Sequence, residues 1–409
     1  MATKFTWRTV LSVLLIVLFG HLAWATESEA EPQIDFDQWL KELRLEARAA
    51  GVSEATLDAA LLGIAPLERV IELDRRQPEF TQTFWGYLDK RVTPQRIERG
   101  RALMLEHGAL LDQIRERYNV QPRFLVAFWA LESNFGDYTG KIPVIASLVT
   151  LAYDQRRSAF FRAQLLDALR ILEARHINNE QMKGSWAGAM GQLQFMPSTF
   201  VAYAKDGDQD GRIDLWVSLP DVFASAANYL SKIGWRGDQT WGREVRLPEG
   251  FDFNMATLAI WKPIGEWQNL GVRRADGRDL PNADIEGSII VPAGHGGPAF
   301  LVYDNFRATL VWNRSINYAL SVGYLADRLV GRPALVAQKP ADERPLSRAE
   351  VEEIQNHLTQ LGYDTGTPDG VVGARTRAAI RSYQRAAALP PDGYPTPELL
   401  DGLRDAVTN

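Results

Sequence analysis

One segment limits the possible folds more than any other. Eight consecutive apolar residues, Phe124 to Leu131, follow Pro122 closely and lead directly into Glu132. Proline is favoured in the first turn of a helix, because its missing N–H would be unpaired there. A helix that is apolar on every face is a buried helix. The sequence therefore predicts a buried helix with a carboxylate at its C-terminal end, where Gly136 can terminate it.

Glu132 has two interpretations at this point. A carboxylate at the end of a buried helix loses solvation, and this raises its pKa towards the range that a general acid needs. In the other interpretation the chain simply reaches the surface where the helix ends, and Glu132 is an ordinary solvated residue. The segment alone does not choose between them.

The spacing of apolar residues predicts a mainly α-helical protein. Helical patterns begin at Phe36 and recur over 160–174, 219–233 and 314–329. Ser53 is a predicted N-cap, and Thr93-Pro94 is predicted to start one further helix that runs to Tyr118. Between residues 242 and 302 short β-prone pieces alternate with Gly and Pro, which indicates a small strand-containing insert.

The two ends of the chain have their own patterns. Residues 1–25 have the layout of a secretory signal peptide, with Lys4 and Arg8, a short apolar run and a small-residue cleavage site. The alternative is an uncleaved anchor; no second run approaches the length of a membrane span. Residues 331–346 contain three prolines and are predicted to be a linker. Residues 347–405 begin with a capping box at Ser347 and predict a compact three-helix module.

Charge and cysteine content exclude several classes of protein. The net charge is −6, which argues against the basic surface of a nucleic-acid-binding protein. The chain has no cysteine, so disulfides, thiolate catalysis, Cys-bound zinc and a lipidated N-terminal cysteine are excluded. The five histidines are scattered without the spacing of zinc ligands. With the N-terminal pattern, we expect a mature protein that is exported to the periplasm, without a membrane span.

A second segment, residues 184–197, combines small residues, amides and aromatics. Its glycines permit close approach of a ligand to the backbone, Gln192 and Gln194 offer amides, and Ser185 offers a hydroxyl. These groups suit an uncharged polar ligand such as a sugar. A purely structural glycine-rich loop is the alternative. The surroundings of Ser185 do not match a nucleophile elbow.

Together these segments resemble a known family. The run from Ala130 to Gly136, followed by the run from Ser185 to Ser198, is similar to the lytic murein transglycosylase B family, and the likeness extends over roughly residues 34–330. The resemblance implies a lysozyme-like helical catalytic domain, here residues 26–330. It implies cleavage of the β-1,4 bond between N-acetylmuramic acid and N-acetylglucosamine in peptidoglycan, with a 1,6-anhydro product.

The same resemblance implies the roles of individual residues. Glu132 would be the single catalytic acid and then the base, with the substrate's N-acetyl group in place of a second carboxylate. Positions that hold the substrate in the family match Ser185, Gln194, Tyr229, Trp312 and Tyr318. Each of these five also has a plain interpretation as a core-packing residue.

Two other functions remain open from the sequence. A glycosidase that hydrolyses its substrate needs two carboxyl groups, and Asp137 is close to Glu132 only in sequence. A hydrolytic muramidase would require a second carboxylate in position. A non-catalytic peptidoglycan-binding scaffold would not need Glu132 at all. No cofactor is expected for the chemistry itself.

An acidic loop predicts a possible structural Ca²⁺ site. Asp206, Asp208 and Asp210, with Gly211 and the carbonyl of Arg212, match the first half of an EF-hand loop. Position 12 is Val217 instead of glutamate, so the standard loop fails. Some members of the family close a longer loop with a later aspartate, and Asp221 is the candidate here. A solvated acidic turn is the alternative.

The tail resembles the peptidoglycan-binding domain type 1. The likeness is carried by Leu361 to Asp364, Pro368 to Gly373 and Thr376 to Ile380. It implies that the partner is the peptidoglycan glycan strand, whereas any complex with other cell-wall enzymes is not readable from the sequence.

Overall fold

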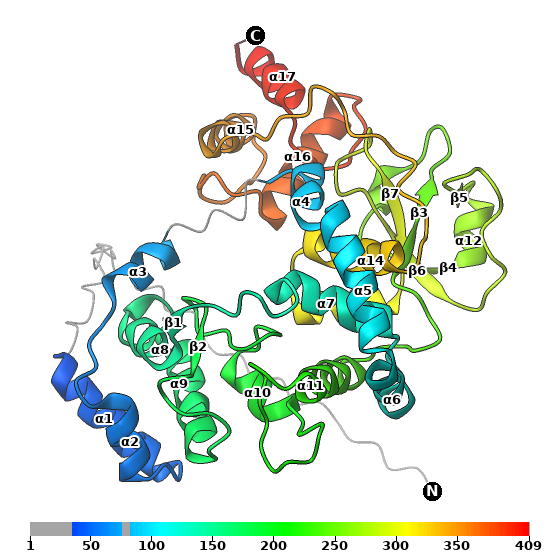
Figure 1. Cartoon of the computed structure of the whole chain (residues 1–409). Coiled ribbons are helices and arrows are strands. Elements are labelled where there is room, and N and C mark those ends of the chain that lie inside the picture. Colours follow the sequence, from blue (N-terminus) through cyan, green and yellow to red (C-terminus); the bar gives the residue numbers. More distant parts are fainter. Residues whose placement is uncertain (1–34, 76–81, 409) are drawn as a thin grey trace, which may run out of the picture.

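The computed structural model describes residues 35–75 and 82–408. They fold into a helical body, a small β-sheet beside it and a three-helix module at the C-terminal end (Figure 1). The predicted signal peptide, residues 1–25, lies outside the described residues. Among the described helices, none combines the length and the apolar character needed to cross a membrane.

The helices of the body are α1 (Phe36–Ala49), α2 (Glu54–Leu61), α3 (Glu68–Arg75), α4 (Phe84–Arg91), α5 (Pro94–Glu106), α6 (Gly108–Tyr118), α7 (Pro122–Ser133), α8 (Val144–Tyr153), α9 (Ser158–Glu173), α10 (Pro197–Tyr203), α11 (Leu219–Lys232), α13 (Asp304–Trp312) and α14 (Ile316–Leu329). The predicted caps are confirmed, because the Ser53 hydroxyl accepts from the amide of Thr56 and the Thr93 hydroxyl accepts from the amide of Arg96.

The prediction of one continuous helix from Thr93-Pro94 to Tyr118 is wrong, because two helices occupy this range. The chain leaves helical geometry at His107, and α5 and α6 are separate helices on either side of it. Gly108 is the first residue of α6, and glycine has low helix propensity because its backbone loses the most freedom on ordering. The apolar spacing continued across the break, which is why it did not reveal two helices.

Helix α7 lies inside the body, packed against α14, α5 and α6 (Figure 1). Every residue from Phe124 to Leu131 is buried, which confirms the predicted buried helix. The helix ends earlier than expected, at Ser133, because Asn134 after it is in the left-handed conformation with φ of +53°. Gly136, with φ of +85°, belongs to the turn that follows.

The insert is confirmed as an antiparallel sheet of five strands in the order β4-β6-β7-β3-β5. Its elements are β3 (Gly242–Arg246), β4 (Lys262–Pro263), α12 (Ile264–Asn269), β5 (Arg273–Arg274), β6 (Glu286–Ile290) and β7 (Ala299–Val302). Strand β7 is buried on both faces: Phe300 and Val302 join the helical core, whereas Leu301 joins a second core that includes Trp267. This alternation fastens the insert to the body. A separate two-stranded ladder pairs β1 (Ile142–Pro143) with β2 (Lys183–Gly184).

The C-terminal module contains α15 (Arg348–Gln360), α16 (Ala374–Ala386) and α17 (Pro397–Thr408) around its own core. The capping box of Ser347 and Glu350 is present in full. The preceding segment 331–346 has no helix or strand, yet it is held to the body. The backbone amides of Val336 and Ala337 both donate to the carboxylate of Glu244 at 2.7 Å. The module also contacts the body directly, through His295 Nδ1 and Asp392 Oδ2 at 2.7 Å.

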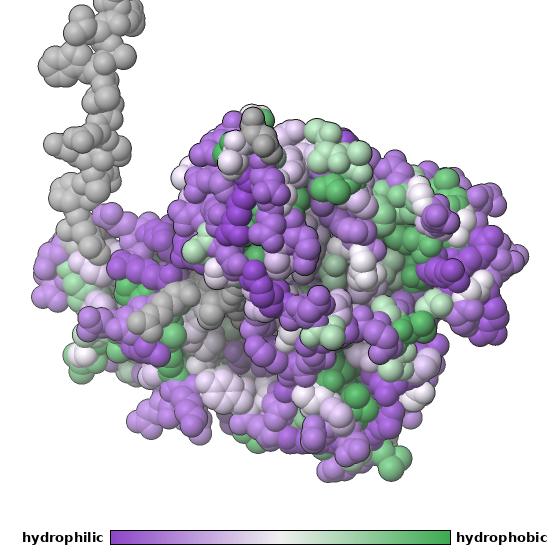
Figure 2. Space-filling view, turned by 90° about the horizontal axis from the view of Figure 1, so that it is seen from above, coloured by the Kyte–Doolittle hydropathy of each residue, from purple (hydrophilic) through white to green (hydrophobic). Residues whose placement is uncertain are grey.

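The surface seen in Figure 2 is mostly hydrophilic, with hydrophobic residues in small separate patches. The most exposed large apolar side chains among the described residues come from separate parts of the chain: Leu62 follows α2, Leu105 lies in α5 and Val217 lies in the acidic loop. Isolated apolar residues on a surface are normal and do not indicate a docking face.

A glycine pair controls how the turn after α7 packs. Gly140 has φ of +97°, and a Cβ there would lie 2.0 Å from the carbonyl group of Gly184. Gly51 has a similar φ of +93°, but a Cβ there would meet nothing within 4 Å. We therefore expect Gly51→Ala to lower the free energy of unfolding by about 1–2 kcal/mol, from backbone strain alone.

Gly140→Ala adds the clash to the same strain, so we expect a loss of more than about 4 kcal/mol. Denaturant unfolding of both variants measures the difference. Equal losses at the two positions would contradict the close packing of the turn on Gly184.

Candidate active site

Glu132 is the last but one residue of α7, and its side chain lies where the buried helix reaches the surface. Two donors meet the same carboxylate oxygen, Oε1. The indole Nε1 of Trp312 donates to it at 2.8 Å, and the hydroxyl of Tyr318 donates at 2.5 Å. Trp312 ends α13 and Tyr318 lies in the first turn of α14, so three helices meet at this carboxyl group.

The two carboxylate oxygens of Glu132 have different roles, because both of these donors bind Oε1. A carboxylate oxygen has two lone pairs, and two donors on Oε1 occupy both. A proton on the Glu132 carboxyl group therefore belongs on Oε2. Burial raises the pKa of Tyr318 well above its usual value of 10, and the nearby charge of Glu132 adds to this effect. Tyr318 thus keeps its proton at neutral pH and remains a donor.

Aromatic rings form a continuous wall beside Glu132. The ring of Trp312 lies 4.5 Å from that of Phe128, 5.1 Å from that of Tyr229 and 5.3 Å from that of Phe195, measured between centroids. Tyr229 also stacks on Tyr203 at 4.5 Å. Burial, followed by the neighbouring Tyr203, raises the pKa of Tyr229. The rings come from α7, α10, α11, α13 and the glycine-rich segment.

Trp312 and Tyr318 contact Glu132 directly, whereas Tyr229 lies against Trp312. Tyr318, however, is only 5% exposed, and its hydroxyl is directed to the carboxylate. Its position is that of a support for the acid, whereas Trp312 and Tyr229 are half-buried and retain accessible surface. Sequence spacing could not separate these positions, because all three are aromatic residues outside a single motif.

The glycine-rich segment has an internal reason for its glycines. A Cβ at Gly188 would lie 2.5 Å from the side chain of Leu148, and one at Gly191 would lie 2.6 Å from the carbonyl oxygen of Leu215. These glycines let the segment pack against its own body. The structural interpretation of the glycines therefore holds at both positions.

Gln192 is also structural, although the sequence predicts its side-chain amide as a ligand contact. It is buried, accepts from Trp129 Nε1 at 2.6 Å and donates to the carbonyl of Trp216 at 2.9 Å. It thereby ties α7 to the segment and to the acidic loop. No local pattern in the sequence indicates this role of Trp129, which depends on a residue 63 positions away.

Gln194 and Ser185 keep the segment in shape. Gln194 has φ of +49°, and its amide nitrogen donates to the carbonyls of Thr139 and Gly191, both at 2.9 Å. The Ser185 hydroxyl accepts from the amide of Ala189 at 3.0 Å. Both side chains are only partly buried, so their predicted contacts with substrate stay predictions.

Asp137 is held by other groups. Its carboxylate pairs with Arg99 and accepts from the side-chain Nδ2 of Asn134 at 2.9 Å. The hydrogen bond from Arg99 is the main reason that the pKa of Asp137 is lowered, so this carboxylate is ionised at neutral pH. A carboxylate that is paired with an arginine and has a lowered pKa is a weak base, and is poorly suited to activate water as the second carboxylate of a hydrolase.

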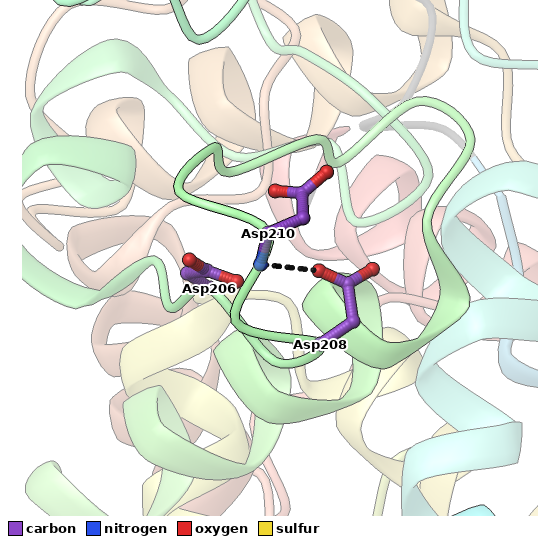
Figure 3. A group of neighbouring side chains, drawn as sticks. All are labelled: Asp206, Asp208 and Asp210. Atoms are coloured by element: carbon purple, nitrogen blue, oxygen red, sulfur yellow. Dashed lines mark hydrogen bonds between the residues drawn. The ribbon is translucent and has the colours of Figure 1, made fainter.

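The acidic loop gathers three of its predicted ligands. One carboxylate oxygen from each of Asp206, Asp208 and Asp210 lies within 4.8 Å of the others (Figure 3). Asp221 is not part of this group. It is 1% exposed, and its two oxygens accept the amides of Gly207 at 2.7 Å and Asp214 at 2.6 Å. Burial raises the pKa of Asp221. Its place is at the base of the loop, which it closes through backbone hydrogen bonds.

Removal of the Tyr318 hydroxyl tests its support of Glu132. In Tyr318→Phe one of the two donors to Oε1 is lost, so we expect kcat to fall by about tenfold or more, with KM little changed. Tyr324→Phe makes the same change on the same helix, away from Glu132, and should leave kcat intact. Equal kcat values for the two variants would contradict the assigned role of Tyr318.

Comparisons with known proteins agree on the family. A family model described as "Transglycosylase SLT domain" matches residues 35–327, and one described as "Putative peptidoglycan binding domain" matches residues 347–403. Membrane-bound lytic murein transglycosylase B of Escherichia coli is 30% identical over 252 residues, which are 58% of this chain and 65% of that protein. The chain thus spans just under two thirds of that relative.

Solved structures extend the likeness to nearly the whole chain. SltB3 of Pseudomonas aeruginosa, in complex with NAG-anhNAM-pentapeptide, is 48% identical with a TM-score of 0.87, and the match covers 90% of this chain and 99% of that one. SltB1 of the same organism is 27% identical with a TM-score of 0.63, over 72% of this chain and 98% of that one. Since the first family model covers more than half of the sequence, the chain belongs to the SLT-domain family of lytic transglycosylases.

Proposed function

We propose that this protein is a periplasmic lytic transglycosylase, which cleaves the β-1,4 bond between N-acetylmuramic acid and N-acetylglucosamine and forms a 1,6-anhydromuramic end. The observation that carries the proposal is the Glu132 carboxyl group, held on Oε1 by Trp312 and Tyr318 at the end of a buried helix. Membership of the family and the likeness to SltB3, solved with an anhydro sugar fragment, support it.

In the proposed reaction, Glu132 acts first as acid and then as base. Protonated Oε2 gives its proton to the glycosidic oxygen as the bond to C1 of muramic acid breaks. The N-acetyl group of the same sugar stabilises the positive charge that develops at C1. The resulting carboxylate takes the proton of the C6 hydroxyl as O6 bonds to C1, which restores protonated Glu132 without adding water.

The environment of Asp137 favours this mechanism over hydrolysis. A hydrolase needs a second carboxyl group placed to activate water or to attack the sugar. Asp137 is committed to Arg99, and its lowered pKa reflects that pairing. The half-buried faces of Trp312 and Tyr229, together with Ser185 and Gln194, are the proposed contacts for the sugars and the N-acetyl group.

Location and wall binding complete the proposal. The predicted signal peptide, residues 1–25, would direct the protein to the periplasm. The C-terminal module would bind peptidoglycan, in accordance with its family match. Because the preceding segment is fastened to the body by Glu244, we propose that the module presents the glycan to the site from a fixed position.

The products of sacculus digestion test the function. We expect wild-type protein to release muropeptides that are lighter than hydrolytic products by one water, as measured by mass spectrometry. Glu132→Gln keeps the shape of the side chain but cannot transfer a proton, so release should fall by at least about 10²–10⁴-fold. Reducing-end products would instead make the protein a muramidase. Retained binding without products from wild-type protein would favour the scaffold.

We also propose that the acidic loop holds a structural Ca²⁺. Three carboxylate oxygens within 4.8 Å of one another are a donor set that suits a hard cation with oxygen ligands. Asp206 already accepts the amides of Gln209 and Gly211, so the loop is shaped around its carboxylates. The carbonyl of Arg212 would be a fourth ligand of the ion. Asp221 would hold the loop in shape through the backbone amides of Gly207 and Asp214. The ion would stabilise the fold and take no part in the reaction.

Thermal unfolding with and without calcium tests this site. At a free Ca²⁺ concentration of 100 times Kd, binding should add about 2.7 kcal/mol to the free energy of unfolding and raise Tm accordingly. Asp208→Asn should abolish the rise and keep the activity. Asp238→Asn changes an exposed aspartate elsewhere and should retain the rise. An unchanged Tm for wild-type protein would rule out a stabilising calcium site.

A further inference from the structure

Helices α7 and α14 are joined at both ends by polar contacts. At one end the Tyr318 hydroxyl donates to Glu132 Oε1 at 2.5 Å. At the other end Arg123 Nη1 lies 3.2 Å from Asp327 Oδ1. The early residue of α7 pairs with the late residue of α14, so the helices are antiparallel. Nine residues separate the two contacts on each helix (132 − 123 and 327 − 318), which is about 13.5 Å of helix.

The Asp327 carboxylate makes polar contacts with four side chains. Besides Arg123, it contacts Arg243 at 3.0 Å, Arg332 at 3.4 Å and the indole Nε1 of Trp241 at 3.1 Å. The residue is only 7% exposed. One buried carboxylate therefore joins α7, α14, the start of β3 and the first residues of the segment that leads to the C-terminal module.

The packing around Asp327 leaves little freedom for α14 to slide. Gly323 lies one turn before it, and a Cβ there would be 2.2 Å from the ring of Trp241. Trp241 thus rests on bare helix backbone and also donates to Asp327. The Arg123 side chain is 15% exposed and also lies over the ring of Phe124. Both ends of the ion pair are consequently fixed by their own surroundings.

Register between two helices is set wherever directional contacts join them. The core between α7 and α14 is apolar, and apolar contacts are non-directional. If α14 slid along α7 by the rise of one residue, Tyr318 would move about 1.5 Å along the helix axis. This movement is enough to break its hydrogen bond of 2.5 Å to Glu132. The ion pair at the far end opposes such a slip.

We propose that Asp327 is a positioning residue for the reaction: through Arg123 it holds α7 and α14 in the register that keeps the Tyr318 hydroxyl on Glu132 Oε1. This inference rests on the proposed function of Glu132. Asp327 itself touches neither Glu132 nor the aromatic wall in this account, and it acts only through the helices.

A double-mutant cycle separates positioning from general stability. Asp327→Asn, measured at a temperature where it is folded, should lower kcat about as much as Tyr318→Phe does, with KM little changed. In the Tyr318→Phe background the hydrogen bond is already lost, so Asp327→Asn should then lower kcat by less than about twofold. Two independent losses that multiply in the double variant would overturn the proposal.

The chain offers a matched control. Asp74 is another buried carboxylate that pairs with two arginines, Arg156 and Arg157, where α3 meets the turn before α9. Asp74→Asn should lower Tm and leave kcat and its response to Tyr318→Phe unchanged. A fall in kcat of the same size for Asp74→Asn would show that loss of stability alone explains the Asp327 result.

A second variant decides the matter if Asp327→Asn does not fold. Arg123→Gln removes only the link to α7, because Asp327 retains Arg243, Arg332 and Trp241. Arg123→Gln should lower kcat as Asp327→Asn does, and it should cause little further fall in kcat in the Tyr318→Phe background. Full activity of Arg123→Gln would refute the inference. Inactive wild-type protein would instead count against the proposed function itself, so the two failures are distinguishable.

Discussion

The site depends on the burial of α7. Its apolar residues fill the centre of the body, and Glu132 is the point where this buried helix meets solvent. A carboxylate in that position needs donors, and Trp312 and Tyr318 supply them from two other helices, both on Oε1. The helices that pack on α7 therefore also leave Oε2 as the oxygen that would carry the proton in the proposed reaction. Burial, packing and proton placement are consequences of one arrangement.

Much of this arrangement could be predicted from the sequence, because it depends on patterns among neighbouring residues. The apolar run predicts the buried helix, Ser53 and Thr93 predict caps, and the β-prone insert forms the five-stranded sheet. Other features depend on contacts between distant residues. The bonding of Gln192 to Trp129 and the burial of Tyr318 have no local signature. Each is determined by what packs against the residue.

The glycine-rich segment shows how one composition serves two purposes. Its glycines leave room for Leu148 and Leu215 of the same protein, which a Cβ would meet. The side-chain nitrogen of Gln194 donates to backbone carbonyls. The same segment places Phe195 against Trp312 and Tyr229 in the aromatic wall. A residue type that suits a sugar site therefore does not reveal which atoms remain for the sugar. That distinction required the three-dimensional contacts.

The central claim is that a single carboxyl group both gives and takes the proton, and that water never enters the product. Digestion of sacculi in water enriched in oxygen-18 tests this claim most directly. The account predicts that the released muramic ends contain no heavy oxygen, because O6 of the sugar itself closes on C1. Heavy oxygen at C1 of the initial products would show attack by water, and it would contradict the one-carboxylate mechanism.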